Sequence, residues 1–353
     1  SECRPFVGSL LPEADRRFIE AAYRQFLALH EPLLAQRVRE RRIIDGHGDL
    51  RCENICMTEP VNVFDCVEFQ PAFRCGDIAN DVSFLLMDLE FRGRRDLAEV
   101  LQARYRQGAK DPTFDTVLPF YQCHRSLVRG KVRGLAWLQH PRSAQGRAVR
   151  GTSRRHFQLA VRYARQCSRP RLVVVGGLIG TGKSTLARSL SAALGAAWLR
   201  TDEIRLKEFA RHRQARQGFA GGLYAPHVSQ LVYQALIRRT ETLLRQGHSV
   251  VCDGMFANGS GRRLLRDIAK QCGASFHFFE CVVPRAVALR RVAKRYAGKT
   301  DISQAKPEHY DRLRSGFEPV RELAVRERTR LSDNRPAHAT HRAALDALRR
   351  AWS

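Results

Sequence analysis

A glycine-rich segment that follows a short apolar run constrains the fold of this chain more than any other feature. Residues 172–175 are Leu-Val-Val-Val, and residues 176–185 are Gly-Gly-Leu-Ile-Gly-Thr-Gly-Lys-Ser-Thr. An uninterrupted apolar run that is rich in β-branched valine predicts a parallel strand that is buried on both faces. Residues 183–194 then have the pattern of a helix. A strand that leads into a helix through a glycine-rich turn is typical of α/β domains.

Strands and helices continue to alternate after this segment. The expected elements are strands at 197–200, 249–252 and 275–283 and helices at 227–246 and 261–272. This alternation predicts a parallel sheet with helices on both faces. The fold class is therefore α/β for the C-terminal part of the chain.

The part before residue 168 has a different pattern. It reads as helices around one short strand-rich patch, with helices at 13–42, 77–91, 97–107, 117–138 and 154–166 and a strand at 61–64. A length of 353 residues suggests about two domains. We therefore expect a mostly helical domain at 1–168 and a second domain at 169–353.

The glycine-rich segment also predicts a nucleotide site. Residues 177–184 fit the pattern GxxxxGK[ST] between a strand and a helix, which is the context that this motif requires. The glycines let backbone N–H groups converge on phosphate oxygens, and the helix N-terminus adds partial positive charge. Lys183 can reach the β- and γ-phosphates, and the Ser184 hydroxyl can hold Mg²⁺. The expected ATP-binding residues are Gly177, Gly180, Thr181, Gly182, Lys183, Ser184 and Thr185.

Carboxylates follow two of the other expected strands. Asp202 comes after the strand at 197–200 and could accept the proton of an incoming hydroxyl, or could simply cap a helix. Arg205, one helical turn later, could hold an anionic group. Asp253 ends the strand at 249–252, where it would orient Mg²⁺ or would be an ordinary loop residue.

Two arginines extend this candidate site. Arg291 and Arg295 lie four residues apart in an expected helix after Pro284, so they share one helix face. They could close over the phosphates and stabilise the charge that is transferred. The alternative is a solvated basic face, because arginine is abundant throughout this chain.

Together, these segments resemble the small P-loop kinases and related AAA-type ATP-binding domains. This group includes gluconate kinase, chloramphenicol phosphotransferase, zeta toxin and the kinase half of polynucleotide kinases. The matching segments, within about 170–353, are GLIGTGKST (177–185), TDEIR (201–205), VVCDG (250–254) and the arginine pair. The resemblance implies Mg²⁺-dependent transfer of the ATP γ-phosphate to a hydroxyl, with Asp202, Lys183, Arg291 and Arg295 as catalytic residues.

The first domain contains a second informative segment, His-Gly-Asp-Leu-Arg-Cys-Glu-Asn at 47–54. It resembles the HGDLHxxN loop of the aminoglycoside phosphotransferase family. The resemblance implies that Asp49 accepts a hydroxyl proton, that Asn54 and Asp65 hold Mg²⁺, and that Asp81 braces the loop. Arg51 stands where the family commonly has histidine.

The residues before this loop bear on whether the first domain can bind ATP. The 46 residues that precede His47 read as helix and contain neither the glycine-rich loop nor the strand lysine of a kinase N-lobe. We therefore expect a kinase-like C-lobe whose N-lobe either was lost or belongs to a segment missing from this chain. As given, this module is not expected to transfer phosphate by itself. In its order of modules, the chain resembles bacterial proteins that join an aminoglycoside phosphotransferase-like domain to a P-loop domain.

Composition leaves several classes of function open. The formal net charge of +26 predicts attraction to polyanions, so a polynucleotide 5′-hydroxyl kinase or RNA-associated enzyme is the alternative to a small-molecule kinase. A nucleotide-dependent switch is a third interpretation. Four cysteines, Cys52, Cys56, Cys66 and Cys75, could form a metal site, although reduced thiols are expected. No apolar run approaches a membrane span, and we expect a cytoplasmic location.

Overall fold

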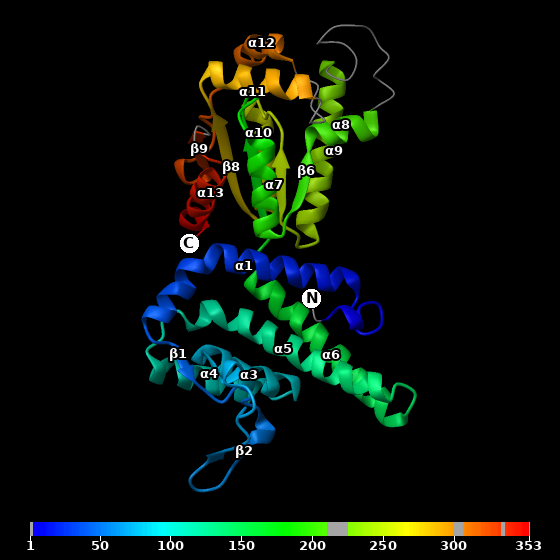
Figure 1. Ribbon diagram of the computed structural model, residues 1–353, viewed down its shortest axis with the longest axis vertical. Coiled ribbons are helices and arrows are strands. Elements are labelled where there is room, and N and C mark those ends of the chain that lie inside the picture. Colours follow the sequence, from blue (N-terminus) through cyan, green and yellow to red (C-terminus); the bar gives the residue numbers. More distant parts are fainter. Residues whose placement is uncertain (1–2, 210–224, 299–305, 333–335, 353) are drawn as a thin grey trace. The chain divides into compact units, whose positions relative to one another are not determined.

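The computed structural model describes residues 3–209, 225–298, 306–332 and 336–352. The chain divides into two compact units, Ser1–Ser168 and Arg169–Ser353, and each is described by itself (Figure 1). No helix in the described ranges is long and apolar enough to cross a membrane.

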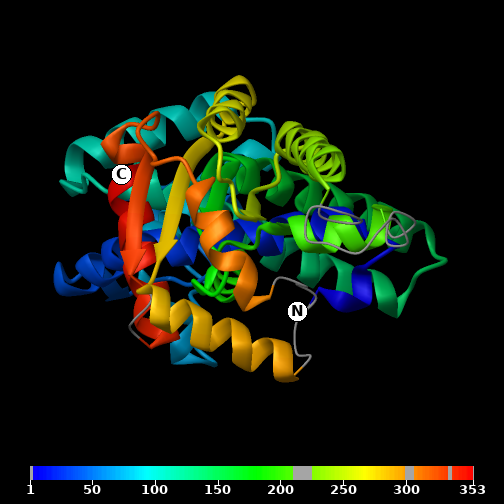
Figure 2. The same ribbon diagram turned by 90° about the horizontal axis from the view of Figure 1, so that it is seen from above.

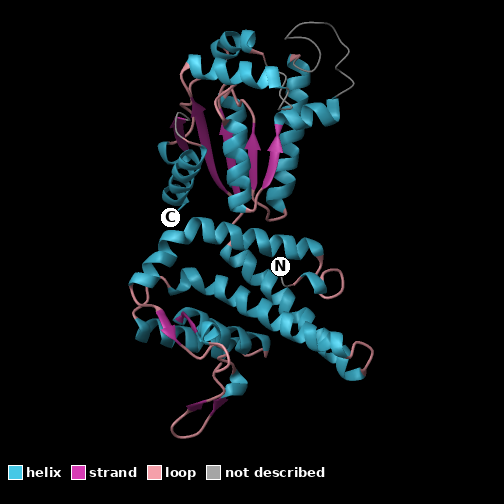
Figure 3. Cartoon of the chain, in the orientation of Figure 1, coloured by secondary structure: helices cyan, strands magenta, loops and turns pink. Residues whose placement is uncertain are grey.

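Helices make up most of the first unit (Figure 3). They are α1 (Glu13–Arg39), α2 (Pro71–Arg74), α3 (Ile78–Phe91), α4 (Arg95–Ala109), α5 (Phe114–Gln139) and α6 (Ala144–Cys167). Helices α5 and α6 pack closely, because a Cβ atom at Gly130 of α5 would lie only 2.9 Å from the ring of Phe157 in α6. Helix α6 begins earlier than the sequence predicted, because the Ser143 hydroxyl accepts a 2.9 Å hydrogen bond from the Gly146 amide and caps it there.

Two short antiparallel pairs of strands complete the first unit. Strand β1 (Ile43–Asp45) pairs with β4 (Cys75–Asp77), and β2 (Ile55–Cys56) pairs with β3 (Asn62–Val63). Strand β1 was not among the elements predicted from the sequence. Its pairing with β4 brings the residues before His47 beside the start of α3.

The second unit is built on a five-stranded parallel sheet, which confirms the α/β fold. The strands are β5 (Arg171–Gly176), β6 (Ala197–Arg200), β7 (Val250–Asp253), β8 (Ser275–Val282) and β9 (Arg328–Ser332). They lie in the order β6-β7-β5-β8-β9, and all the pairings are parallel (Figure 3). Sequence analysis missed β9, because the edge strand Arg-Thr-Arg-Leu-Ser has no apolar run.

Helices cover both faces of this sheet (Figures 1 and 2). They are α7 (Lys183–Leu194), α8 (Thr201–Phe209), α9 (Pro226–Arg245), α10 (Gly259–Gln271), α11 (Arg285–Gly298), α12 (Tyr310–Ser315) and α13 (Ala337–Trp352). Helices α7 and α13 contact one another and the sheet, and α9 and α10 form a second contacting pair. Leu172 and Val174 of β5 share a buried core with apolar residues of α9 and α10.

The register of the strands determines what meets at one edge of the sheet. Val175, near the end of β5, lies opposite Asp253 of β7, and Arg200 of β6 also lies opposite Asp253. The carboxyl ends of β5, β6 and β7 are therefore level. The glycine-rich loop, the start of α8 and Asp253 all emerge at this edge.

Candidate active site

The glycine-rich loop between β5 and α7 has a backbone that excludes side chains at two positions. Gly177 and Gly180 have φ angles of +136° and +75°. A Cβ atom at Gly177 would collide with the carbonyl oxygen of Cys281, and one at Gly180 would lie 2.5 Å from the carbonyl oxygen of Ala288. Glycine is therefore required at both positions for this loop to pack against its neighbours.

Lys183, the first residue of α7, lies across this loop. Its ammonium group donates a 2.6 Å hydrogen bond to the carbonyl oxygen of Leu178, which also accepts a 2.7 Å bond from the Thr181 hydroxyl. Burial lowers the pKa of Lys183, and the nearby carboxylates of Asp253 and Asp202 oppose that effect. An anion that approached the loop would meet a poorly solvated positive charge.

Asp253 ends β7 and is buried in the same place, with an exposed fraction of 4%. Burial raises its pKa, whereas Lys183, a hydrogen bond with the Ser184 side chain and Arg200 counteract the rise. The ion pair between Arg200 Nε and the Asp253 carboxylate measures 3.4 Å. A hydroxyl oxygen and a carboxylate oxygen thus lie together beside the loop, as a magnesium site requires.

Asp202 lies in the first turn of α8 and lines the adjoining cavity. Among the residues that the structure describes, no hydrogen-bond or ion-pair partner engages its carboxylate. Arg205, one turn later, is buried and donates a 3.2 Å hydrogen bond to the Ser229 hydroxyl of α9. Asp202 is therefore available to accept a proton from a molecule in the cavity.

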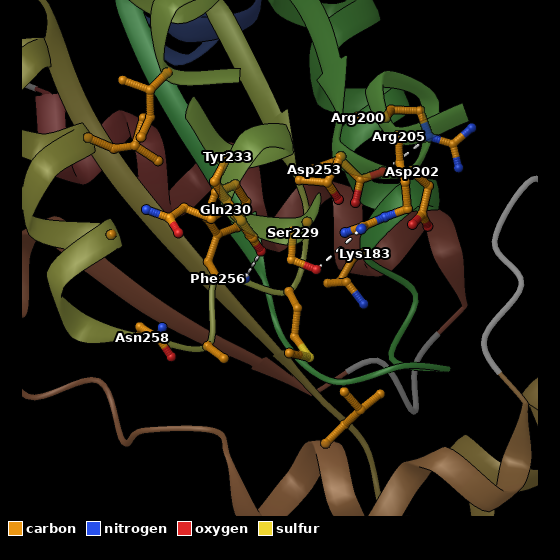
Figure 4. Close-up of a pocket in the computed structure, with 18 of the residues that line it drawn as sticks. Lys183, Arg200, Asp202, Arg205, Ser229, Gln230, Tyr233, Asp253, Phe256 and Asn258 are labelled. Carbon is orange, nitrogen blue, oxygen red and sulfur yellow. Dashed lines mark hydrogen bonds and ion pairs between the residues drawn. The ribbon is translucent and has the colours of Figure 1, made fainter. Parts of the chain in front are cut away.

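The cavity has a volume of about 830 Å³ and is lined by the ends of β6 and β7, by α9 and α10, and by Arg295 and Leu313. Figure 4 shows its charged side chains, including Lys183, Asp202 and Asp253, grouped on one side. Gln230 and Asn258 lie on the other side. The cavity is thus charged at the end next to the glycine-rich loop and neutral and polar at the opposite end.

The wall after Asp253 is held in place by contacts with Tyr233 and Arg262. Phe256 has a φ angle of +46°, and its amide donates a 3.0 Å hydrogen bond to the Tyr233 hydroxyl of α9. Arg262 of α10 is fully buried and donates to the carbonyl oxygens of Phe256 and Ala257 at 2.8 and 3.0 Å. Its guanidinium also forms an ion pair with Glu322. Sequence analysis identified none of these residues.

A second cavity of about 470 Å³ lies on another side of the glycine-rich loop. Gly182 and Thr185 line it, together with Arg291 of α11 and with His338 and His341 of α13. The two arginines that were expected to act as a pair thus line different cavities: Arg291 lines this one, and Arg295 lines the larger one. One helix reaches both sides of the loop.

The candidate loop of the first unit is firmly braced. The Asp81 carboxylate accepts hydrogen bonds from the amides of His47 and Gly48 at 2.7 and 3.0 Å, as the resemblance implied. The side-chain amide of Asn54 donates a 3.0 Å bond to the Asp49 carbonyl oxygen. Asp65 is exposed with a φ angle of +63°, next to Phe64, whose amide bonds to the Asn54 carbonyl oxygen.

The carboxylate of Asp49 forms an ion pair with a neighbouring arginine. Arg51, which is 7% exposed, donates to one oxygen of the Asp49 carboxylate at 3.0 Å and to the other at 2.6 Å. Both oxygens of the Asp49 carboxylate are therefore engaged in charge-assisted hydrogen bonds. The two candidate bases therefore differ. Arg51 engages the carboxylate of Asp49, whereas no described residue engages the carboxylate of Asp202.

The cysteines form no metal centre in the structure as described. All ten are free thiols. Within the described ranges, no group of three or more histidine, cysteine, aspartate or glutamate residues is arranged to hold a metal ion. Cys52, Cys56, Cys66 and Cys75 thus gain no support as a metal set.

The second unit is similar to a known family of domains. Residues 172–320 match the model of an AAA domain family, AAA_33. The matched region begins at β5 and includes the glycine-rich loop, Asp202 and Asp253. The second unit is therefore similar to the AAA domains of this family over these residues.

Relatives and solved structures extend the comparison. Uncharacterized proteins of Mycobacterium tuberculosis and Mycobacterium bovis are 34% identical over 293 residues, which cover 81% of this chain and 57% of theirs. The match thus spans little more than half the length of these relatives. A sugar kinase from Janibacter is 19% identical, with a TM-score of 0.39, over 51% of this chain and 94% of that protein. The APS kinase of Mycobacterium tuberculosis is 22% identical, with a TM-score of 0.39, over 51% of this chain and 98% of that protein.

Proposed function

We propose that the second unit is an ATP-dependent kinase that transfers the γ-phosphate of ATP to a hydroxyl group of a small molecule. One observation carries the proposal. The carboxylate of Asp202, which has no hydrogen-bond or ion-pair partner among the described residues, and the ammonium group of Lys183 line one cavity of about 830 Å³, at the edge where the glycine-rich loop leads into α7. A cation that can bind phosphate and a carboxylate that can accept a proton thus line the same cavity.

The two cavities suit the two substrates. The triphosphate would lie along the glycine-rich loop, whose amides and helix N-terminus favour phosphate oxygens. The nucleoside would occupy the smaller cavity, beside Thr185, Arg291 and His341. The larger cavity would hold the hydroxyl acceptor, with Asp202 and Arg295 at its charged end.

The expected reaction is a direct displacement. The acceptor oxygen forms a bond to the γ-phosphorus while the bond from that phosphorus to the β,γ-bridging oxygen breaks. Asp202 takes the hydroxyl proton, and ADP leaves. Lys183 and Arg295 would stabilise the negative charge on the transferring group.

Magnesium fits the residues beside the loop. Ser184 and Asp253 offer the oxygen ligands that Mg²⁺ prefers, and a cation there would offset the cost of burying the Asp253 carboxylate. When bound, Mg²⁺ would neutralise part of the charge of the β- and γ-phosphates. ATP and Mg²⁺ are therefore the proposed cofactors.

Binding and turnover together test the proposal. ATP affinity should be measured by calorimetry with and without Mg²⁺, and ADP formation should be followed with a panel of hydroxyl compounds that includes a 5′-hydroxyl oligonucleotide. Lys183→Ala should lower turnover about 10²–10³-fold. Lys207→Ala is the matched control, because Lys207 is 71% exposed and pairs with Glu203. The absence of Mg²⁺-supported ATP binding would refute the proposal.

A further inference from the structure

The larger cavity has a neutral polar wall that the proposed chemistry does not use. Gln230 and Gln234 lie four residues apart on α9, and Asn258 lies at the end of the loop before α10. All three are exposed within the cavity lining, and none makes a side-chain hydrogen bond to another described residue. Three carboxamides are thus available to one bound molecule.

Carboxamides favour a particular kind of ligand. Each one offers an N–H₂ donor and a carbonyl acceptor, and a hydroxyl group also both donates and accepts. Leu264 and Leu265 of α10 provide an apolar surface in the same lining. A molecule that presents several hydroxyl groups along one edge and C–H groups on its face would match both features.

The charges of the cavity argue against a polycationic acceptor. Among the described lining residues, the acidic side chains are Asp202 and Asp253, and both belong to the end beside the glycine-rich loop. The basic ones are Lys183, Arg200, Arg205 and Arg295. An amine-rich molecule would therefore find no carboxylate at the neutral end and would meet positive charge at the other end.

The aromatic residues argue against a nucleobase in this cavity. Tyr233 and Phe256 pack edge to face, with their ring centroids 5.5 Å apart. Phe256 is only 3% exposed, and the Tyr233 hydroxyl accepts from the Phe256 amide. Neither ring is presented as a stacking surface, which single-stranded nucleic acids commonly use.

We propose that the acceptor is a polyhydroxylated small molecule of the carbohydrate type, held by Gln230, Gln234 and Asn258 with one hydroxyl directed at Asp202. This inference rests on the proposed kinase activity and names its substrate class. Neutral alditols and hexoses share their hydroxyl arrays with sugar acids. The number of basic side chains at the charged end also allows an acid group on the molecule.

The experiment compares acceptors and variants of the full chain. Phosphorylated product is measured by mass spectrometry with ATP, Mg²⁺ and four acceptor classes, namely neutral alditols and hexoses, aldonic acids, a polycationic aminoglycoside and a 5′-hydroxyl oligonucleotide. Phosphorylation of alditols, hexoses or aldonic acids in preference to the other two classes is expected. Comparing the first two classes shows whether an acid group is needed.

Variants then test the wall itself. Gln234→Leu and Asn258→Ala should each raise KM for the best acceptor about 3- to 10-fold while the KM for ATP stays unchanged, since each loses hydrogen bonds to the acceptor alone. Gln271→Leu, an exposed change at the end of α10 outside the cavity lining, is the control. All three are surface changes, so the fold is expected to persist.

The possible failures can be told apart. Lys183-dependent phosphorylation of the aminoglycoside or the oligonucleotide alone would overturn this inference and leave the kinase activity standing. An unchanged acceptor KM in both wall variants would also overturn it, as would ATP binding without transfer to any sugar-like compound. If ATP does not bind at all, the proposed kinase activity is refuted, and the inference about the acceptor that rests on it is refuted as well.

Discussion

Arg51 donates to both carboxylate oxygens of Asp49, so the carboxylate of the first unit's candidate base is already neutralised by its neighbour. Asp202 in the second unit has no such partner among the described residues. An aspartate lies within a polar loop in one unit and at the start of a helix in the other, and its carboxylate has different surroundings in the two places.

The first prediction follows from this contrast. A Lys183→Ala variant of the full chain should show no phosphate transfer from the first unit, and Asp49→Asn should leave wild-type turnover unchanged. Turnover measured by ADP release checks both. Residual transfer in Lys183→Ala that disappears on adding Asp49→Asn would show that the first unit is active after all.

The second prediction concerns the proposed base. Asp202→Asn should reduce kcat about 10²–10⁴-fold, because the amide cannot accept the hydroxyl proton. ATP affinity measured by calorimetry should stay close to that of the wild type. Asp267→Asn is the control, since Asp267 is 51% exposed and pairs with Arg266. Full activity of Asp202→Asn would assign the base to another residue.

The third prediction concerns the buried carboxyl of Asp253. Burial raises its pKa, so the folded state binds this proton more tightly than the unfolded chain does. Its contribution therefore favours folding at low pH and is lost as the pH rises through the folded-state pKa. At neutral pH, without ligands, Asp253→Asn should therefore raise the melting temperature. The expected rise is about 2–4 °C for each 1 kcal/mol gained in the free energy of unfolding.

This gain should shrink as the pH falls, and Asp253→Asn should abolish the extra stabilisation by ATP that requires Mg²⁺. Scanning calorimetry at several pH values, with and without Mg²⁺ and ATP, measures both effects. A lower melting temperature at neutral pH would mean that the ion pair with Arg200 outweighs the cost of burial.

The fourth prediction concerns Arg262, which positions the cavity wall without touching the cavity's contents. Arg262→Met leaves Glu322 without its partner and should cost about 3–5 kcal/mol of stability. At temperatures where the variant is folded, the acceptor KM should rise more than the KM for ATP. Arg262→Lys should recover part of this loss. Arg266→Met, at a more exposed arginine of the same helix, is the control.

Part of this architecture could be predicted from sequence because it depends on contiguous residues. The buried run at 172–175 and the glycines after it determine a strand, a turn and a helix locally, and the carboxyl ends of parallel strands then bring Asp202 and Asp253 to that turn. The edge strand β9 could not be found in this way, because its residues are mostly polar and its place depends on pairing with β8.

The neutral wall of the cavity could not be predicted from the sequence either, because tertiary packing brings its residues together. Gln230 and Gln234 read as ordinary polar positions of a surface helix, and only the packing of α9 beside α10 places them near Asn258. Their spacing of four residues was the one signal available. The sequence similarly showed that Arg291 and Arg295 share a helix face, but not that the glycine-rich loop lies between their two cavities.

Helix α11 carries consequences for how the two substrates influence each other. Arg291 and Arg295 belong to one helix, so a molecule in either cavity could contact α11. If binding orders α11, the first substrate to bind would bear the entropic cost of that ordering, and the second would bind at a lower cost. We expect heterotropic synergy, in which saturating nucleotide tightens acceptor binding and saturating acceptor tightens nucleotide binding by the same factor.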